Sequence, residues 1–216
     1  MTATSPNPEE RVHESKGALI VFGGLPGTGK TTLARAVAET HSATYLRIDT
    51  IEQTLRCSGT LAGDVGPAGY LIAYALAESN LLLGRTVIAD SVNPLAVTRE
   101  AWRRVAARTS SAIVEIEIIC SDAAEHRRRV ETRSVDVAGL DLPSWEDVIK
   151  RDYEPWDCPR IVLDTAGCTI PGALEELQKR MNGSGLVPRG SRSMPEAAGS
   201  ASTRRGGRPR RRSRTG

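Results

Sequence analysis

The sequence predicts an α/β fold in which a parallel β-sheet is covered by helices on both faces. Five short apolar segments rich in β-forming residues alternate with helical segments along the chain. This alternation is typical of strand–helix–strand units. A glycine-rich turn, Gly24–Thr31, lies directly between the first apolar segment and the first helical one. Asp49 and Asp90 follow two other β segments, and because ligands of such sheets bind outside the carboxyl ends of the strands, these features should share one edge.

The individual elements follow from apolar periodicity and from residues that begin or end helices. Pro67 and Gly84 bound the third expected helix, and Asp122 can cap the fifth. We expect strands at 18–23, 43–48, 86–90, 112–119 and 160–164, and helices at 30–40, 50–57, 67–83, 94–108, 122–133, from 144 onwards and 171–181. Glu115 and Glu117 alternate with isoleucine in the fourth strand, which predicts a sheet face open to water.

The distribution of charge divides the chain into two unlike parts. The 216 residues have a formal net charge of +3, but residues 182–216 hold nine Arg and a single acid. Residues 1–181 therefore carry 20 basic and 25 acidic side chains and form a mildly acidic body. Leu186–Ser191 matches a thrombin cleavage sequence, so we interpret the basic segment as a vector-derived tail rather than a nucleic-acid-binding arm. We expect residues 1–16 to be disordered and residues 17–181 to form one domain.

Cysteine, histidine and apolar content narrow the class of protein further. The four cysteines show no C-x-x-C spacing and no secretory leader precedes them, so we expect reduced cysteines and a cytoplasmic location. No apolar run approaches the length that crosses a bilayer. The three histidines are scattered, which argues against a metal site built from protein ligands alone.

The glycine-rich turn reads G-x-x-x-x-G-K-T, the pattern of a phosphate-binding loop, or P-loop. Its glycines let backbone N–H groups surround a polyphosphate, Lys30 reaches the β- and γ-phosphates, and Thr31 offers a hydroxyl to Mg²⁺. The helix that follows adds the positive end of its dipole. A turn that served packing alone would not require the Lys-Thr pair at this offset. We expect ATP to contact Gly24, Gly27, Thr28, Gly29, Lys30, Thr31 and Thr32.

The two aspartates at strand ends are the candidate acid–base groups. A phosphotransferase requires a base or positioner for the attacking hydroxyl and a second acid that holds Mg²⁺ through water. We assign the first role to Asp49 and the second to Asp90. The alternative for each is a helix cap or turn residue, because aspartate is common there. The acceptor pocket is expected between Asp49, the glycine-rich loop 58–69 and the helix that follows it.

A cluster of arginines precedes the expected mobile loop. Arg129 and Arg133 are four residues apart and would share one helix face, so we expect them in a lid at about residues 129–145. From there they could close over the triphosphate and stabilise the charge that develops in transfer. Arg127 or Arg128 is interpreted as a solvated surface charge.

Four stretches together resemble the bacterial P-loop kinases often described as AAA-family ATPases; these are Gly24–Thr32, the Asp49 segment, Val87–Pro94 and Arg129–Trp156. The resemblance covers about residues 17–180. The order of features is similar to that of gluconate, shikimate and adenylylsulfate kinases and chloramphenicol phosphotransferase. It implies a three-layer, nucleoside-monophosphate-kinase-like fold with sheet order 2-3-1-4-5 and a lid after the fourth strand. It also implies Thr165, in the loop after the last strand, as a contact of the adenine nucleotide.

One stretch, Asp90–Asn93, resembles the Asp-Thr-Asn turn in the kinase domain of phage polynucleotide kinase. That family has a base aspartate followed three residues later by an arginine. Asp49 matches the base, but Glu52 stands where the arginine would be. An acidic side chain there would repel a substrate phosphate, which argues against a polynucleotide substrate.

The leading interpretation is an ATP- and Mg²⁺-dependent kinase that transfers the γ-phosphoryl group to a hydroxyl of a small molecule. It would act as a monomer or homodimer, with neither a membrane nor nucleic acid as a partner. A polynucleotide 5′-hydroxyl kinase is the alternative within the class, and the mildly acidic body lacks the basic groove it would need. From another class, an ATP-binding regulatory switch with slow hydrolysis remains open, because nothing in the sequence identifies the acceptor.

Overall fold

The computed structural model describes residues 17–59 and 63–183. Its elements, in chain order, are β1 Ala18–Gly23, α1 Lys30–His41, β2 Thr44–Arg47, α2 Ile48–Cys57, α3 Ala68–Leu82, β3 Val87–Asp90, α4 Ala96–Thr109, β4 Ala112–Ile119, α5 Ala123–Glu131, α6 Trp145–Ile149, β5 Ile161–Asp164 and α7 Ile170–Gly183. The expectations for residues 1–16 and for the tail beyond residue 183 lie outside the described residues. Within those residues, no helix is both long and apolar enough to cross a membrane.

The five strands form one parallel sheet in the order β2-β3-β1-β4-β5. This confirms the predicted α/β fold and the strand order implied by the resemblance. The register pairs Phe22 of β1 with Asp90 of β3, and Asp90 in turn with Arg47 of β2. The glycine-rich turn therefore begins beside the end of β3, and β2 ends next to β3 on the other side, as the sequence predicts.

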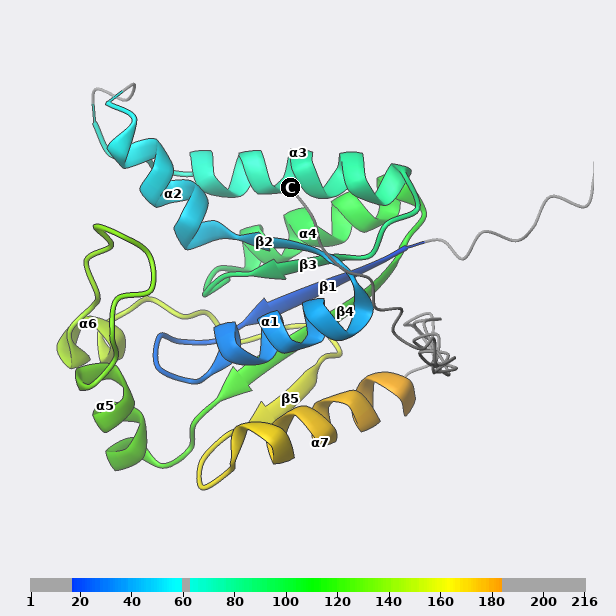
Figure 1. Ribbon diagram of the computed structural model, residues 1–216. Helices are drawn as coiled ribbons and strands as arrows, with labels where there is room; N and C mark the ends of the chain where they lie inside the picture. Colours follow the sequence, from blue (N-terminus) through cyan, green and yellow to red (C-terminus); the bar gives the residue numbers. More distant parts are fainter. Residues whose placement is uncertain (1–16, 60–62, 184–216) are drawn as a thin grey trace, which may run out of the picture.

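Helices cover both faces of the sheet, as Figure 1 shows. Every residue of β1 is buried, because alternate side chains point into two separate cores. Ile20 and Phe22 pack with α1 and α7 on one face, whereas Leu19 and Val21 pack with α3 and α4 on the other. Helices α5 and α6 lie beyond the carboxyl ends of the strands, at the left of Figure 1. The sheet edge that carries the glycine-rich turn is therefore also the edge that these two helices flank.

Two boundaries differ from prediction in ways that matter for the site. Strand β2 ends at Arg47, so Asp49 lies in the first turn of α2 rather than in a loop. A carboxylate is favourable there because it faces the positive end of the helix dipole. Helix α5 ends at Glu131, so Arg133 is not on the same helix as Arg129. The chain leaves the helix at this point and turns back toward Asp136, which pairs with Arg133.

The prediction that Glu115 and Glu117 face water is wrong. Both are buried, with 7% and 8% of their surface exposed. Glu115 pairs with Arg103 of α4 at 3.0 Å, and Glu117 pairs with Arg160 at 2.6 Å. The hydroxyl of Tyr153 also donates to Glu117 at 3.1 Å. Helix α4 and the segment that follows α6 together cover this face. They supply the cations that allow the two carboxylates to be buried.

Candidate functional site

The P-loop joins β1 to α1, and its backbone approaches two neighbours closely. Gly24 has φ +133°, and a side chain there would collide with the carbonyl oxygen of Ile118 on β4. Gly27 has φ +85°, and a Cβ atom there would come within 2.6 Å of Val130 on α5. Both conformations are open to glycine and strained for other residues. The loop is thus held between β4 and α5, where Lys30 begins α1.

A buried histidine joins α5 to the P-loop. Nε2 of His126 lies 2.8 Å from the carbonyl oxygen of Pro26, and because a carbonyl oxygen only accepts, this nitrogen carries the proton. The His126 ring also meets Trp145 of α6 edge-on, with ring centroids 5.2 Å apart. The region expected to be a lid is therefore anchored at its base directly to the phosphate-binding turn.

A cavity of about 430 Å³ opens on the P-loop and contains both arginines that we expected in a lid. It is lined by Gly27, Gly29, Lys30, Thr31, Thr32, Arg35, Arg129, Thr132, Arg133, Ser134 and Asp136. Arg129 donates to Glu125 at 2.7 Å and to the hydroxyl and carbonyl oxygens of Thr165 at 2.8 and 2.9 Å. The cavity is thus rich in cationic groups, as a site for a polyphosphate would be.

Two of the nucleotide contacts expected within the P-loop do not line this cavity. Gly24 lies at the start of the P-loop, beside β4 and outside the cavity lining. Thr28 is 2% exposed, and its hydroxyl donates to the carbonyl oxygen of Leu25 at 2.9 Å. Thr28 therefore stabilises the turn internally in this structure.

Asp136 is a residue of this cavity that sequence reasoning missed. Its carboxylate lies 2.6 Å from Arg47, 3.0 Å from Arg35 and 3.3 Å from Arg133. The hydrogen bond from Arg47, with help from the other two cations, holds the pKa of this carboxyl far below its usual value. Arg47 is only 4% exposed, so its charge requires acidic partners. The two residues are 89 positions apart, and no local pattern could have joined them.

A second cavity, of about 240 Å³, adjoins the first at the expected adenine position. It is lined by Gly29, Thr32, Leu33, Arg129, Thr165, Cys168, Thr169, Ile170 and Ala173. Thr165 is 5% exposed, and its hydroxyl lies within 3.0 Å of the carbonyl oxygens of Thr28 and Ile119. Its hydroxyl therefore joins the P-loop, β4 and Arg129, while the residue forms part of the cavity wall.

Asp90 ends β3 and is 1% exposed. Its Oδ2 atom accepts a hydrogen bond from the hydroxyl of Tyr45 at 2.6 Å and lies 4.0 Å from Nε of Arg47. Burial and the nearby Asp90 carboxylate raise the pKa of Tyr45, so its hydroxyl remains a donor. Oδ1 of Asp90 is buried and has no hydrogen-bond partner in the described part of the chain. Asp90 thus keeps one oxygen available for a further donor.

Lys30 and Asp49 face a shared space. Both line a cavity of about 370 Å³ that reaches from Pro26 to residues 140–143. Burial lowers the pKa of Lys30, although the carboxylates of Asp90 and Asp49 oppose this shift. Asp49 lies 3.4 Å from Arg47 and is 31% exposed at its side chain. A bound anion would compensate for the cost of burying the lysine charge.

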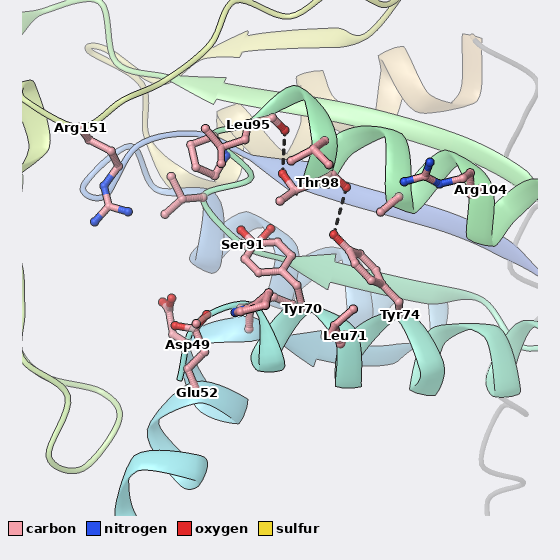
Figure 2. Close-up of a pocket in the computed structure, with 17 residues that line it drawn as sticks. Asp49, Glu52, Tyr70, Leu71, Tyr74, Ser91, Leu95, Thr98, Arg104 and Arg151 are labelled. Atoms are coloured by element: carbon pink, nitrogen blue, oxygen red, sulfur yellow. Dashed lines mark hydrogen bonds between the residues drawn. The ribbon is translucent and has the colours of Figure 1, made fainter. Parts of the chain in front are cut away.

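On its other side, Asp49 lines a cavity of about 540 Å³ between α2, α3 and α4. Figure 2 shows Asp49 and Glu52 at one end, Tyr70, Leu71 and Tyr74 along the middle, and Arg104 at the far end. The position agrees with the acceptor pocket expected between Asp49, the loop before α3 and α3 itself. Helix α4 forms the remaining wall, which the sequence did not indicate.

Residues 19–150 match the sequence model of a family described as an AAA domain. Uncharacterized proteins of Mycobacterium tuberculosis and Mycobacterium bovis are 40% identical to this chain over 109 residues. That match covers 45% of this chain but only 22% of those proteins, so the chain spans about a fifth of their length.

Solved structures share the fold at low sequence identity. A sugar kinase from Janibacter is 16% identical with a TM-score of 0.59, covering 80% of this chain and 99% of that one. Kti12 of Chaetomium thermophilum is 22% identical with a TM-score of 0.57, covering 76% and 97%. A gluconokinase from Sinorhizobium meliloti is 16% identical with a TM-score of 0.51, covering 79% and 98%.

These likenesses show a P-loop structure similar to that of small-molecule kinases. The P-loop domain itself implies nucleotide binding. Since the matched region, residues 19–150, makes up more than half of the 216 residues, this chain belongs to the AAA-domain family of P-loop proteins.

Proposed function

We propose that this protein is an ATP- and Mg²⁺-dependent kinase that transfers the γ-phosphoryl group to a hydroxyl of a small-molecule acceptor. The observation that carries the proposal is the position of Asp49. Its carboxylate lines the cavity that contains Lys30 and also the larger cavity on its other side. A base between a phosphate site and an acceptor site is what direct transfer requires.

In the proposed reaction, the acceptor oxygen forms a bond to the γ-phosphorus as the bond from that phosphorus to the bridging oxygen of ADP breaks. ADP leaves with the electron pair, and the proton of the acceptor hydroxyl passes to Asp49. Lys30 binds the β- and γ-phosphates, and Arg129 and Arg133 approach them from the lid side of the same cavity. Gly27, Gly29 and Thr32 complete the phosphate-binding turn, and Thr165 lies at the nucleoside end.

The residues present suit Mg²⁺. Thr31 offers a hydroxyl in the phosphate cavity, and Oδ1 of Asp90, which has no hydrogen-bond partner among the described residues, can accept from a metal-bound water. Mg²⁺, when bound there, would neutralise charge on the transferred phosphoryl group. Tyr45 donates to Oδ2 of Asp90, and Arg47 lies beside the same atom. These two contacts fix the direction in which Oδ1 points.

The test is ADP release from ATP and Mg²⁺, measured with and without a panel of hydroxyl compounds that includes a 5′-hydroxyl oligonucleotide. We expect acceptor-dependent ADP release that falls at least ~100-fold in Lys30→Ala. The matched control is Arg128→Ala, which removes a cation whose side chain is 70% exposed. ATP turnover that no hydroxyl compound stimulates would overturn the kinase proposal in favour of a regulatory switch. Preferential transfer to the oligonucleotide would instead identify a polynucleotide kinase.

A further inference from the structure

The walls of the 540 Å³ cavity beside Asp49, which we call the acceptor cavity, are mostly apolar and aromatic. It is lined by Ile48, Asp49, Glu52, Gly66, Pro67, Tyr70, Leu71, Tyr74, Ser91, Val92, Pro94, Leu95, Val97, Thr98, Ala101, Arg104 and Arg151. A volume of this size holds a ligand larger than a simple polyol. The acceptor cavity therefore favours a molecule that contributes apolar surface.

The two tyrosines of this cavity offer their rings, because their hydroxyls are already engaged by the protein. The hydroxyl oxygen of Tyr70 accepts from the backbone N–H of Asn93 at 3.2 Å. The hydroxyl of Tyr74 donates to the carbonyl oxygen of Thr98 at 3.1 Å. Burial raises the pKa of both phenols, so they stay uncharged. An aromatic or alicyclic ring can pack against such faces.

Two carboxylates stand at the end of the acceptor cavity nearest to Lys30. Glu52 lies one helical turn after Asp49 on α2, and both line the acceptor cavity. A group that carries its own negative charge beside the reacting hydroxyl would be repelled by this pair.

The cationic side chains of the acceptor cavity do not cancel the repulsion of anions by Asp49 and Glu52. Arg104 is exposed and lies at the opposite end from Asp49, as Figure 2 shows. Arg151 is exposed and lies at the same end as Asp49 and Glu52, on the facing wall. Exposed guanidinium groups retain their hydration and attract an anion only weakly. Asp49 and Glu52 are only 31% and 21% exposed at their side chains, so their charge near the reacting position is screened less than that of Arg151.

We infer that the acceptor is an alcohol with an aromatic or alicyclic body and no anionic group beside the reacting hydroxyl. This inference rests on the proposed function, because it takes the reacting hydroxyl to lie at Asp49. The body of the acceptor lies along Tyr70, Leu71 and Tyr74 on one side and α4 on the other. Acceptors with a carboxylate, phosphate or sulfate beside the reacting hydroxyl are disfavoured by the same arrangement.

Three matched probes separate the parts of this inference: methyl mandelate, mandelate and methyl lactate. Methyl mandelate has a ring and an uncharged ester beside its hydroxyl, mandelate has the ring with a carboxylate, and methyl lactate has the ester without the ring. Binding is measured by calorimetry and transfer by ADP release with detection of the phosphorylated product. We expect methyl mandelate to bind at least ~10-fold more tightly than either other probe. Equal or tighter binding of mandelate or methyl lactate, or no binding of any probe, overturns the inference.

A pair of variants on α3 tests whether binding occurs in this cavity. Leu71 lines it and is 60% exposed, whereas Leu76 lies outside it on the same helix and is 43% exposed. Leu71→Asp should weaken methyl mandelate binding at least ~5-fold and leave ATP binding unchanged, because the charge enters an apolar wall. Leu76→Asp should change neither by more than ~2-fold. Unchanged methyl mandelate binding in Leu71→Asp places the probe elsewhere and contradicts the inference.

The two proposals fail in different ways. If methyl mandelate binds in a Leu71-dependent manner but no Lys30-dependent transfer occurs, phosphoryl transfer is wrong and the binding preference stands. If an anionic polyol is phosphorylated in a Lys30-dependent manner and Leu71→Asp has no effect, the kinase proposal stands and the acceptor class is wrong.

Discussion

The assignment of Asp49 as the base can be tested by changing this single residue. Its side chain is 31% exposed and contacts Arg47 at 3.4 Å, so substitution by asparagine keeps the shape and removes the base. We expect Asp49→Asn to lower acceptor-dependent ADP release at least ~100-fold, with ATP binding within ~2-fold of wild type. Glu176→Gln, an exposed change on α7, serves as the charge-matched control. Full transfer by Asp49→Asn would rule out the base assignment.

Gly27 offers a second test at this scale, because a side chain there meets α5. A Cβ atom would lie 2.6 Å from Val130 and 3.2 Å from His126, in a backbone conformation with φ +85°. Gly27→Ala should therefore lower the free energy of unfolding by about 1–3 kcal/mol and weaken ATP binding, because the turn and α5 must separate. Urea unfolding and calorimetry measure the two effects.

The control for this variant is Gly63→Ala, where a Cβ atom would meet nothing within 4 Å. We expect a change in unfolding free energy within about 0.5 kcal/mol there. Equal stability of the two variants would show that the turn adapts to a side chain and that the close packing of α5 is not required.

Pairing between α4 and β4 can be tested at the scale of whole elements. Arg103 neutralises Glu115, whose side chain is 6% exposed. Arg103→Ala would leave that carboxylate buried, and we expect a loss of about 2–3 kcal/mol in unfolding free energy. Arg108→Ala on the same helix breaks the pair with Glu78 at a position 52% exposed, so its loss should stay within about 1 kcal/mol. Urea unfolding at neutral pH distinguishes the two variants. Similar losses of unfolding free energy would contradict the conclusion that the buried pair of Arg103 and Glu115 stabilises the fold more than the exposed pair.

The same elements show where local sequence patterns were sufficient. Pro67 and Gly84 bracket α3 as predicted, Asp122 caps α5 through the backbone N–H groups of residues 124 and 125, and all five strands fall within two residues of their expected ends. These features depend on neighbours in the chain. Glu115 and Glu117 were misplaced because their partners, Arg103 and Arg160, come from other elements and leave no periodic signal.

At the scale of the whole molecule, Asp136 joins the region after α5 to the rest of the domain. Its partners come from α1, from the end of β2 and from the turn after α5. Asp136→Asn should lower the unfolding free energy at neutral pH by about 1 kcal/mol, allowing for a carboxylate side chain that is 29% exposed. Glu131→Gln, whose side chain is 49% exposed, should change it by less than about 0.5 kcal/mol.

The pH dependence of this difference follows from the direction of the pKa shift. The pKa of Asp136 is lowered in the folded state by Arg47 and its neighbours. Its stabilising contribution is therefore complete above the unfolded-state pKa of about 3.9 and is lost as the pH falls below it toward the folded-state pKa. The difference between wild type and Asp136→Asn should shrink progressively below about pH 4. A difference that stays constant down to pH 3 in urea unfolding would show that Asp136 does not titrate in this way.

The sequence by itself determined the P-loop, the order of strands and helices, and the placement of Asp49 and Asp90 at the sheet edge. Each of these depends on residue spacing or on the geometry that any parallel sheet imposes. Lid boundaries and residue roles stay predictions. Only the tertiary structure decided that Arg47 reaches Asp136 across 89 positions and that α4 closes the acceptor cavity. Such contacts depend on how separate layers pack, and packing brings together side chains whose distance along the chain carries no signal.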